Sequence, residues 1–475
     1  MQISELIETE IKAEVTGIAF SSDTVKAGDL FFCLKGSAFD GHDFAALAVE
    51  KGAAAVVCER EVDVSVPCLL VPDARLAFAK AASAFYGNPA KKLKTFGITG
   101  TNGKTTTAYI LAEILRQAGE RVGLIGTNCV QYGEVYRAAN LTTPDPLELY
   151  ATLADMVNAG ITSVVMEVSA HALALQKTAG IRFTVAGFTN LSQDHLDYFG
   201  EMESYARAKA KLFTASMACR AVLNADDPFG RSLIQSCALP VLSYGTQNPA
   251  DVFGIDLKMS AEGLSYLINA EDDIGRVKFA LPGRFNMYNT LCAATMAHAV
   301  GVGLKDILRG IKAVKRVDGR YNLINATDFS VIIDFAHTAD GLKNIITSVR
   351  EFAPARLIVV FGCGGDRDKA KRPQMGEVAA TLSDLCIVTS DNPRSEDPEA
   401  IIEEVLRGVP PERAAFVRSE PTRTEAIKQA FSLAEKGDMV LIAGKGAENY
   451  QEIKGVKHAY NDEAFVMKLL ADKKI

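Results

Sequence analysis

A glycine-rich stretch from Thr95 to Thr107 carries residue types that could bind a nucleotide. Glycines let backbone N–H groups turn onto anionic oxygens, and a helix that begins after them adds partial positive charge. Lys104 could reach the outer phosphates, and the Thr105 hydroxyl could sit on a metal ion. The spacing departs from the general form G-x-x-x-x-G-K-S/T, because Ile98 stands where glycine is required. The alternative is a chance Lys-Thr in a glycine turn, but the strand-to-helix context favours a nucleoside triphosphate site.

Two other predicted strands end near side chains that could hold a metal ion. Glu167 lies near the end of the β-branched run Ser163–Val168, and His195 follows the apolar run Val185–Leu191. Open α/β sheets place their ligands at the carboxyl ends of strands. A glutamate and a histidine beside a phosphate loop therefore indicate metal binding, with satisfied structural residues as the alternative.

A lysine on an apolar helix face needs a chemical explanation. Tyr205, Lys209 and Phe213 recur at the helical spacing of four, so all three lie on one face of a predicted helix. Burying a lysine is costly unless it is neutralised, paired or chemically altered. Alternatively, the methylene groups of Lys209 lie along the apolar face while its amine reaches solvent, and the spacing does not distinguish the two arrangements.

Length and composition limit the class of protein. A chain of 475 residues should form about three domains, and 48% hydrophobic with 23% charged residues is typical of a soluble globular protein. The net charge of −7 argues against a nucleic-acid partner. We find no apolar run of about 20 residues and no signal-peptide pattern at the N-terminus. Nine cysteines without a C-x-x-C pair favour buried free thiols in a reducing cytoplasm.

The elements that position these residues form three predicted units, residues 1–90, 91–317 and 318–475. In the first, Asp73 is expected to cap a helix that runs to Tyr86. Continuous apolar runs in the second are typical of a parallel sheet covered on both faces. The third alternates strands and helices like a second doubly wound sheet. The fold class is therefore α/β.

Polar clusters follow four predicted strands of the third unit. They are Asp334–Thr338, Gly364–Asp368, Asp391–Arg394 and Gly444–Glu448. Because parallel strands end at one edge of a sheet, the clusters should line one crevice. A solvated rim would explain the charges, but not why each cluster follows an apolar strand.

These motifs together resemble the Mur ligases of bacterial peptidoglycan synthesis over essentially the whole chain, especially the members that add the third amino acid. The matching motifs are Gly100–Thr105, Met166–Ser169, Asn190–Asp197, Tyr205–Lys209, Phe285–Asn289, Asp334–Thr338 and Asp391–Arg394. The resemblance implies a small N-terminal α/β domain that binds UDP-MurNAc (1–90). It also implies a central P-loop ATP-binding domain with a parallel sheet (91–317) and a C-terminal Rossmann-like domain that binds the amino acid (318–475).

The resemblance implies an ATP-dependent acid–amino-acid ligase. It would add meso-diaminopimelate to UDP-N-acetylmuramoyl-L-alanyl-D-glutamate through an acyl phosphate, serving cell wall biogenesis, cell shape and division. The expected partners are these small molecules and ATP. The expected protein is a cytoplasmic monomer with no nucleic-acid partner and no membrane span.

The resemblance also assigns the nucleotide and metal residues. The ATP contacts would be Gly100, Thr101, Asn102, Gly103, Lys104, Thr105, Thr106, Asn289, Arg320, Asp334 and His337. Two Mg²⁺ ions would be held by Thr105, Glu167, His195 and Lys209. Lys209 would act as a CO₂-derived carbamate (N6-carboxylysine), which favours the buried alternative for its side chain. The catalytic residues would be Lys104, Lys209 and His195.

The remaining implied contacts belong to the two other substrates. UDP-MurNAc-dipeptide would meet Ser22, Thr142, Thr143, Ser169 and Lys177, with a further contact at Ser37–Phe39, which departs from the polar form of some relatives. Lys177 stands where many relatives carry arginine, so the charge is kept without the bidentate fork. Diaminopimelate would meet Arg367, Asp391, Asn392, Arg394, Gly444 and Glu448.

Arg394 decides the expected amino acid. Family members that use meso-diaminopimelate carry Asp-Asn-Pro-Arg, and those that add lysine lack the arginine. A guanidinium can bind the distal carboxylate of diaminopimelate with two parallel hydrogen bonds. The alternatives are a lysine-adding relative, a folylpolyglutamate synthetase-type ligase, and a stand-alone P-loop ATPase or kinase.

Overall fold

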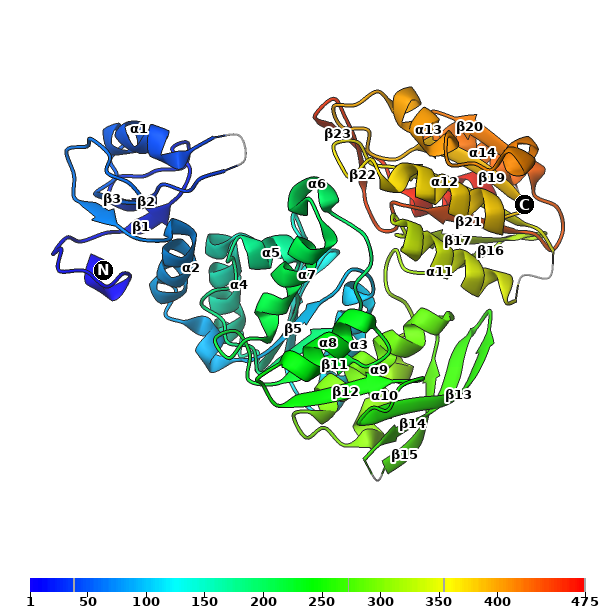
Figure 1. Cartoon of the computed structure of the whole chain (residues 1–475), viewed down its shortest axis with the longest axis horizontal. Helices are drawn as coiled ribbons and strands as arrows, with labels where there is room; N and C mark the ends of the chain where they lie inside the picture. Colours follow the sequence, from blue (N-terminus) through cyan, green and yellow to red (C-terminus); the bar gives the residue numbers. More distant parts are fainter. Residues whose placement is uncertain (37–38, 272, 353–354, 474–475) are drawn as a thin grey trace.

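The chain folds into three units that lie along an open arch (Figure 1). The computed structural model describes residues 1–36, 39–271, 273–352 and 355–473. The predicted contact at residues 37–38 lies outside the described residues. Within the described ranges, no helix is both long and apolar enough to cross a bilayer.

The N-terminal unit is a four-stranded parallel sheet in the order β1-β2-β3-β4. Its strands are β1 (Gly17–Ala19), β2 (Asp29–Phe32), β3 (Ala55–Cys58) and β4 (Cys68–Leu70), and its helices are α1 (Ala45–Glu50) and α2 (Ala74–Phe85). Asp73 caps α2 as predicted, because its carboxylate accepts from the backbone N–H of Leu76 at 2.9 Å. Helix α2 also packs against the central unit, which attaches the two units to one another.

The central sheet has eleven strands in the order β15-β14-β13-β12-β11-β10-β5-β9-β6-β7-β8. The strands are β5 (Lys94–Thr99), β6 (Val122–Ile125), β7 (Cys129–Tyr132), β8 (Val135–Ala138), β9 (Ser163–Glu167), β10 (Val185–Phe188), β11 (Ala221–Asn224), β12 (Val241–Gly245), β13 (Val252–Ser260), β14 (Gly263–Ala270) and β15 (Asp273–Phe279). The strands from β13 to β6 pair in parallel, as the apolar runs predicted. Antiparallel strands that the sequence did not predict extend both edges.

Helices cover the central sheet on both faces. They are α3 (Lys104–Gln117), α4 (Pro146–Asn158), α5 (Ala170–Ala174), α6 (Leu196–Phe199), α7 (Met202–Ala210), α8 (Pro228–Ser236), α9 (Arg284–His298) and α10 (Leu304–Ala313). Helix α3 packs against α9 and α10, and buried residues from all three belong to one hydrophobic core. This packing fixes the helix that follows the glycine loop.

The C-terminal unit has a six-stranded sheet in the order β16-β17-β21-β18-β19-β20. Its strands are β16 (Asn322–Asn325), β17 (Ser330–Asp334), β18 (Leu357–Cys363), β19 (Leu385–Ser390), β20 (Val417–Glu420) and β21 (Met439–Ala443); its helices are α11 (Ala339–Arg350), α12 (Lys371–Leu382), α13 (Pro398–Leu406), α14 (Arg423–Leu433) and α15 (Asp462–Lys473). A separate hairpin is formed by β22 (Tyr450–Ile453) and β23 (Val456–Ala459). Except for the edge strand β16, the sheet is parallel, as the doubly wound pattern predicted.

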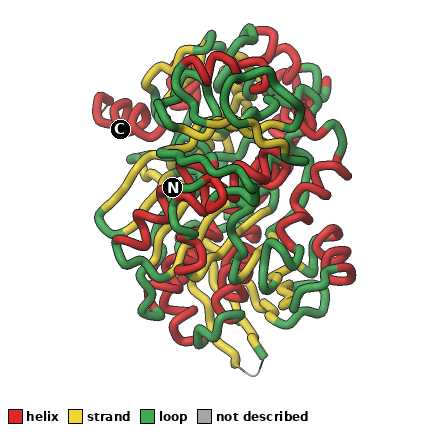
Figure 2. Tube along the Cα trace, turned by 90° about the vertical axis from the view of Figure 1, so that its left-hand side faces the viewer, coloured by secondary structure: helices red, strands yellow, loops and turns green. Residues whose placement is uncertain are grey.

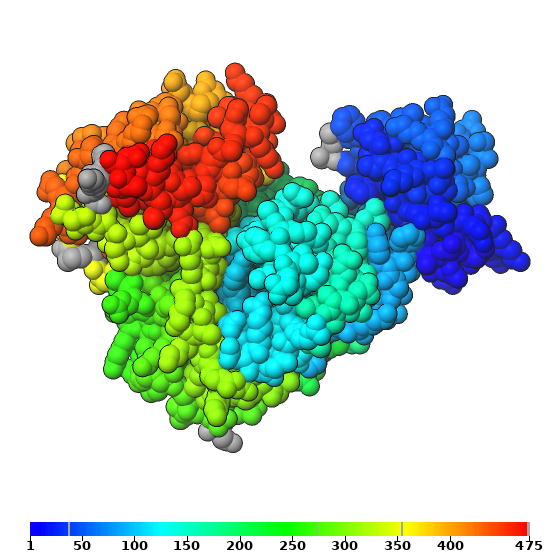
Figure 3. Space-filling view, turned by 180° about the vertical axis from the view of Figure 1, so that it is seen from behind, coloured from blue at the N-terminus to red at the C-terminus, as the bar shows by residue number. Residues whose placement is uncertain are grey.

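The three units make unequal contacts. The space-filling view shows the N-terminal and C-terminal units standing apart over the central unit, with a notch between them (Figure 3). The view turned by 90° shows strands in both the upper and the lower part of the molecule, with helices around them (Figure 2). All nine cysteines are free thiols, as predicted, and six of them are buried, whereas Cys68, Cys219 and Cys237 are partly exposed.

Candidate functional site

The glycine loop connects β5 to α3 and holds Lys104 above its own backbone. The Lys104 ammonium donates to the carbonyl oxygens of Gly100 at 2.9 Å and Thr101 at 2.8 Å. Burial lowers the pKa of Lys104, although Glu167 and Asp194 oppose the shift. The loop therefore presents a desolvated cation whose hydrogen bonds go to uncharged oxygens.

Lys209 lies inside the protein beside the same loop, so the inward reading of its helix face is confirmed. Its side chain is 1% exposed, and its amine donates to the carbonyl oxygen of Gly100 at 2.8 Å. The amine also lies 4.2 Å from the centroid of the Tyr205 ring. Burial, reinforced by the charge of Lys104, lowers the pKa of Lys209 well below its usual range. This environment favours the uncharged, nucleophilic form of the amine.

Thr105 and Glu167 meet at the bottom of the loop. The Thr105 hydroxyl donates to Glu167 Oε2 at 2.9 Å, and the Thr127 backbone N–H donates to Glu167 Oε1 at 2.8 Å. Glu167 is the last residue of β9, where the sequence placed it, and is 1% exposed. A hydroxyl and one carboxylate are the oxygen donors that magnesium uses together with phosphates, so the pair fits that ion.

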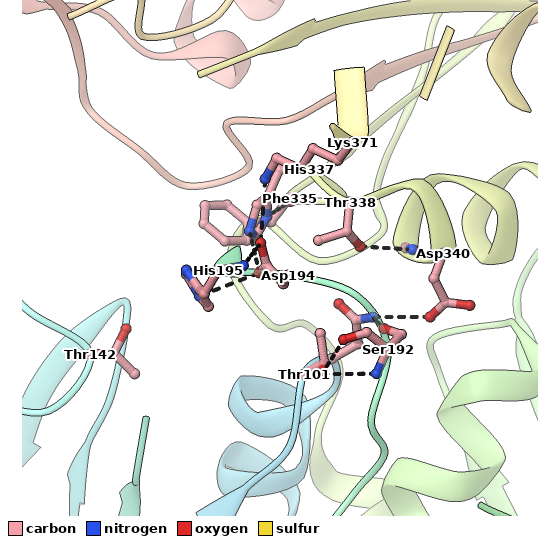
Figure 4. A network of polar contacts seen from close by, with 12 residues as sticks. Thr101, Thr142, Ser192, Asp194, His195, Phe335, His337, Thr338, Asp340 and Lys371 are labelled. Atoms are coloured by element: carbon pink, nitrogen blue, oxygen red, sulfur yellow. Dashed lines mark hydrogen bonds and ion pairs between the residues drawn. The ribbon is translucent and has the colours of Figure 1, made fainter. Parts of the chain in front are cut away.

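A second group of side chains surrounds Asp194, which the sequence analysis did not select (Figure 4). Asp194 Oδ2 lies 3.3 Å from His195 Nε2 and 3.8 Å from His337 Nε2, while Lys371 Nζ lies 3.4 Å from Oδ1. Burial opposes ionisation, but His337 and Lys371 outweigh it and hold the pKa of Asp194 well below its usual range. Because Lys371 and His337 belong to the C-terminal unit, this carboxylate connects the two units.

His195 has the neutral form that metal binding requires. Burial lowers its pKa to about 3, although the Asp194 carboxylate opposes the shift. Its ring packs edge-on against His171 at 4.7 Å between centroids, and its φ of 57° is unusual for a residue other than glycine. Within the described ranges, three or more Cys, His, Asp or Glu side chains never gather as a metal site. The structure therefore places His195 and Lys209 together around Tyr205, separate from the Thr105–Glu167 contact.

A cavity of about 400 Å³ opens beside the glycine loop and is lined by residues of both units. Seven of the predicted ATP contacts line it: Asn102, Gly103, Thr105, Thr106, Asn289, Arg320 and Asp334. Arg320 reaches back from the C-terminal unit and donates to the Thr105 hydroxyl at 3.1 Å. Gly100, Thr101, Lys104 and His337 do not line this cavity. Gly100, Thr101 and Lys104 belong to the glycine loop itself, and His337 lies beside Asp194.

The N-terminal cavity, of about 640 Å³, brings two predicted residues together. Ser22 and Lys177 both line it, together with the aromatic side chains Phe20, Phe31, Phe39, Phe44 and Phe78. Lys177 pairs with Asp145 at 2.7 Å. The other three predicted residues lie nearer to β9. Thr143 donates to the Glu167 backbone oxygen at 2.9 Å, Ser169 N–H donates to Thr143 at 3.1 Å, and the hydroxyls of Thr142 and Thr127 are 3.1 Å apart.

The six residues predicted to bind diaminopimelate all lie in the C-terminal unit. Asn392 donates to Glu448 Oε2 at 2.9 Å, and Asp391 Oδ2 is buried without a hydrogen bond from any described residue. Gly444 lies against that oxygen. Arg394 donates to the Gly365 carbonyl oxygen at 2.6 Å. Arg367 is exposed and donates to the Asp366 carbonyl oxygen at 2.8 Å, so it is the least enclosed of the six predicted residues.

The sequence analysis did not predict two of the residues found at these sites, Lys371 and Asp226. Lys371 belongs to the charged run from Asp366 to Arg372, which reads as a solvated surface, yet its side chain is buried against Asp194. Asp226 follows β11 and accepts from the backbone N–H groups of Thr246, Gln247 and Asn248 at 2.7, 3.1 and 2.8 Å. A position after a strand is the only sequence signal that could have selected Asp226.

The fold and the loop define a three-unit α/β protein with a phosphate-loop type of central unit, in which two units line the cavity beside the loop. Three family profiles match the chain: "Mur ligase family, catalytic domain" at residues 14–86, "Mur ligase middle domain" at 98–297, and "Mur ligase, glutamate ligase domain" at 319–446. A UDP-N-acetylmuramoyl-L-alanyl-D-glutamate–2,6-diaminopimelate ligase from Bacillus licheniformis is 44% identical over 470 residues, covering 97% of this chain and 96% of that protein. The chain belongs to the Mur ligase family.

Solved structures agree with the family. A structure described as UDP-N-acetylmuramoyl-L-alanyl-D-glutamate–2,6-diaminopimelate ligase superposes with a TM-score of 0.72 at 32% identity, covering 100% of this chain and 99% of that one. Folylpolyglutamate synthase from Mycobacterium tuberculosis, complexed with ADP and AMPPCP, has a TM-score of 0.64 at 20% identity, covering 78% of this chain and 92% of that one. The second likeness shows a shared fold alone.

Proposed function

We infer that this protein is an ATP-dependent ligase that joins meso-diaminopimelate to UDP-N-acetylmuramoyl-L-alanyl-D-glutamate. The observation that carries the proposal is the convergence of Lys104, Arg320 and Lys209 at one glycine loop. The C-terminal unit, which bears Arg394, contacts this loop through Arg320. The likeness to diaminopimelate ligases over nearly the full chain supports the same reaction.

The first step brings two anions together. An oxygen of the D-glutamate side-chain carboxylate would attack the γ-phosphorus of ATP, the bond from that phosphorus to the β–γ bridging oxygen would break, and ADP would leave. Lys104 and Arg320 would supply the positive charge that offsets this repulsion. Lys104 would exchange its two carbonyl partners for phosphate oxygens, which costs little because no carboxylate has to be displaced.

The second step forms the amide. An uncharged amino group of the diamino acid would attack the acyl carbon, and phosphate would leave with one former carboxylate oxygen while the nitrogen loses a proton. Closure of the C-terminal unit on the central unit would keep water from the acyl phosphate. Contacts that would hold this closure are Asp194–Lys371, Asn102–Asp340 at 3.1 Å and Gln193–Asp368 at 3.3 Å.

Magnesium would supply charge neutralisation at the phosphates. Thr105 and Glu167 would hold one ion. His195 and a carbamate on Lys209 would hold a second. The support is that burial lowers the pKa of the Lys209 amine and so favours the uncharged form that can take up CO₂. A pKa of about 3 also leaves His195 with a lone pair for a metal.

Arg394 supports diaminopimelate over lysine. Its guanidinium is partly buried, donates to the Gly365 carbonyl oxygen, and has its Nε 3.5 Å from Glu452 Oε2. This guanidinium would bind the distal carboxylate that lysine lacks. Without that carboxylate the guanidinium would be left with an incomplete set of partners, which penalises lysine. The pocket around Ser22 and Lys177 would take the UDP-MurNAc end, with its aromatic side chains against the base and sugar.

An ADP-release assay with an amino-acid panel tests the proposal. We expect ADP release to require UDP-MurNAc-L-Ala-D-Glu and meso-diaminopimelate together, and L-lysine to support much less. Equal release without the two substrates would identify a stand-alone ATPase. Release with L-lysine but not diaminopimelate would overturn the assignment of the amino acid.

A further inference from the structure

Lys445 is a fully buried cation that none of the roles above uses. Its residue exposure is 0%, and it sits between Gly444 and Gly446 in the loop that follows β21. Both glycines have positive φ, 114° and 52°, a conformation that other residues adopt only with strain. The loop backbone therefore directs this lysine inward.

The ammonium of Lys445 holds two side chains of the predicted diaminopimelate pocket. It donates to Glu448 Oε2 at 2.7 Å and to Asn392 Oδ1 at 3.1 Å. Asn392 also donates through Nδ2 to Glu448 Oε2 at 2.9 Å. These three contacts close a triangle. The Glu452 backbone N–H also donates to Asn392 Oδ1 at 2.9 Å, so the lysine and this N–H together fix which way the Asn392 amide faces.

The triangle leaves one oxygen of the pocket available. Both hydrogen bonds to the Glu448 carboxylate end on Oε2, and none from a described residue ends on Oε1. The Glu448 side chain is 25% exposed, whereas Lys445 is enclosed. A substrate ammonium can therefore reach Glu448, and Lys445 cannot contact the substrate without leaving its partners.

The same loop contacts the nucleotide end of the site. A side chain at Gly446 would collide with the Gly319 carbonyl oxygen at 2.7 Å and with the Phe335 side chain at 2.8 Å. The Phe335 ring in turn lies 4.3 Å from the Arg320 guanidinium carbon. The backbone that carries Lys445 thus packs directly on residues beside the ATP cavity.

We propose that Lys445 is a positioning residue that orients Glu448 and Asn392 so that Glu448 Oε1 receives the distal ammonium of the diamino acid. The inference rests on the proposed function, because it assigns a ligand to this pocket. Lys445 acts through Glu448 rather than on the substrate, and it balances the carboxylate charge before the substrate arrives.

A double-mutant cycle tests this coupling. Lys445→Met and Glu448→Gln, alone and together in the full chain, are assayed for KM and kcat with each substrate. Lys445→Met should raise KM for meso-diaminopimelate about tenfold or more, because a charge-assisted hydrogen bond is lost. KM for ATP and for UDP-MurNAc-dipeptide should stay within about twofold. The double variant should be no worse than Glu448→Gln alone, because interacting residues are not additive.

Three controls make the result decisive. Lys468→Met, at an exposed position on α15, should match the wild type in every constant. Lys445→Arg, which keeps charge and donors, should retain more affinity than Lys445→Met. Thermal unfolding of each variant separates lost folding from lost positioning.

The opposing outcomes are equally defined. The inference would be overturned if the double variant raised KM by the product of the two single-variant effects. Equal increases in all three KM values would also overturn it, as would failure of both Lys445 variants to fold. If the wild type uses L-lysine instead of diaminopimelate, the proposed function fails. The same cycle run with L-lysine still measures the coupling between Lys445 and Glu448.

Discussion

The phosphate loop has a half-buried and a buried lysine, Lys104 and Lys209, and the C-terminal unit has the buried Lys445, but the two regions treat the charge differently. At the loop, Lys104 and Lys209 donate to backbone carbonyl oxygens, and neither forms an ion pair with a described residue. In the pocket, Lys445 pairs with Glu448 at 2.7 Å. The phosphate loop therefore leaves its amines without a counterion, whereas the lysine charge in the C-terminal unit is already balanced by Glu448.

The difference matches what each region would receive. A triphosphate and a carboxylate bring only negative charge, so a loop whose Lys104 has no counterion gains most when they bind. A diamino acid brings both signs, so a pocket that presents Arg394 on one side and Glu448 on another can satisfy both. The cost of the first arrangement is desolvation of the free amines, which is why the pKa values of Lys104 and Lys209 are lowered.

The largest expected effect comes from removing the loop cation. Lys104→Met should lower kcat by about 10³-fold, because it removes positive charge that balances the transferring phosphate. Steady-state ADP release measures this, with Lys80→Met at an exposed position on α2 as the control. A loss no greater than the control would mean that the uncompensated cation has no part in phosphate transfer.

Substitution of Lys209 should change activity and stability in opposite directions, because the buried amine is needed for catalysis but costs folding free energy. Lys209→Met should lower kcat by about 10²-fold or more. It should also raise the melting temperature at pH 7 by a few degrees, since a buried amine no longer has to lose its proton on folding.

The pH dependence has a defined sign. Because the folded pKa of Lys209 is lowered, the unfolded chain binds more protons between the two pKa values, so this group's contribution to stability rises with pH. Activity should fall as pH drops through the folded pKa, because protonation blocks the carbamate. A ¹³CO₂-derived NMR signal present in wild type and missing in Lys209→Met checks the modification. A lower melting temperature with full activity would contradict this account.

Substitution of Arg394 tests the predicted diaminopimelate site. Arg394→Ala should lower kcat/KM for meso-diaminopimelate about 10²-fold, through loss of a charge-assisted pair with the distal carboxylate. The value for L-lysine should change little, so the preference between the two amino acids narrows. Arg407→Ala, an exposed arginine after α13, is the matched control. An equal loss for both amino acids would show that Arg394 does not recognise the distal carboxylate.

The smallest expected effect lies at the rim of the nucleotide cavity. Asp226 holds the segment from Thr246 to Asn248 and accepts from the Tyr288 hydroxyl at 2.9 Å. Asp226→Asn should raise KM for ATP by several-fold, because an amide cannot accept all of these bonds. KM for diaminopimelate should not move. A change in both constants would indicate a general loss of structure.

The sequence predicted the elements whose patterns are local. Asp73 caps α2 and Glu167 ends β9, both as expected. Helix α7 carries Lys209 on its predicted buried face, although it starts at Met202, and Lys211–Phe213 forms a separate 3₁₀ turn. The run from Val185 was predicted too long. Strand β10 ends at Phe188, because Thr189 turns away to donate to the Asn102 carbonyl oxygen at 2.7 Å.

Contacts between distant segments were beyond the reach of those patterns. Asp194 and Lys371 are 177 residues apart and come from different units, so neither helical nor strand periodicity connects them. The antiparallel strands at both edges of the central sheet are similarly set by pairing rather than by composition. The Lys445 triangle depends on two left-handed glycines whose effect appears only once the loop is folded.

Isotope transfer tests the central claim most directly. UDP-MurNAc-L-Ala-D-Glu labelled with ¹⁸O in the D-glutamate side-chain carboxylate is turned over with ATP and meso-diaminopimelate, and the released phosphate is analysed by mass spectrometry. An acyl phosphate predicts one ¹⁸O in each phosphate for every amide formed. Unlabelled phosphate accompanying the amide product would contradict the account.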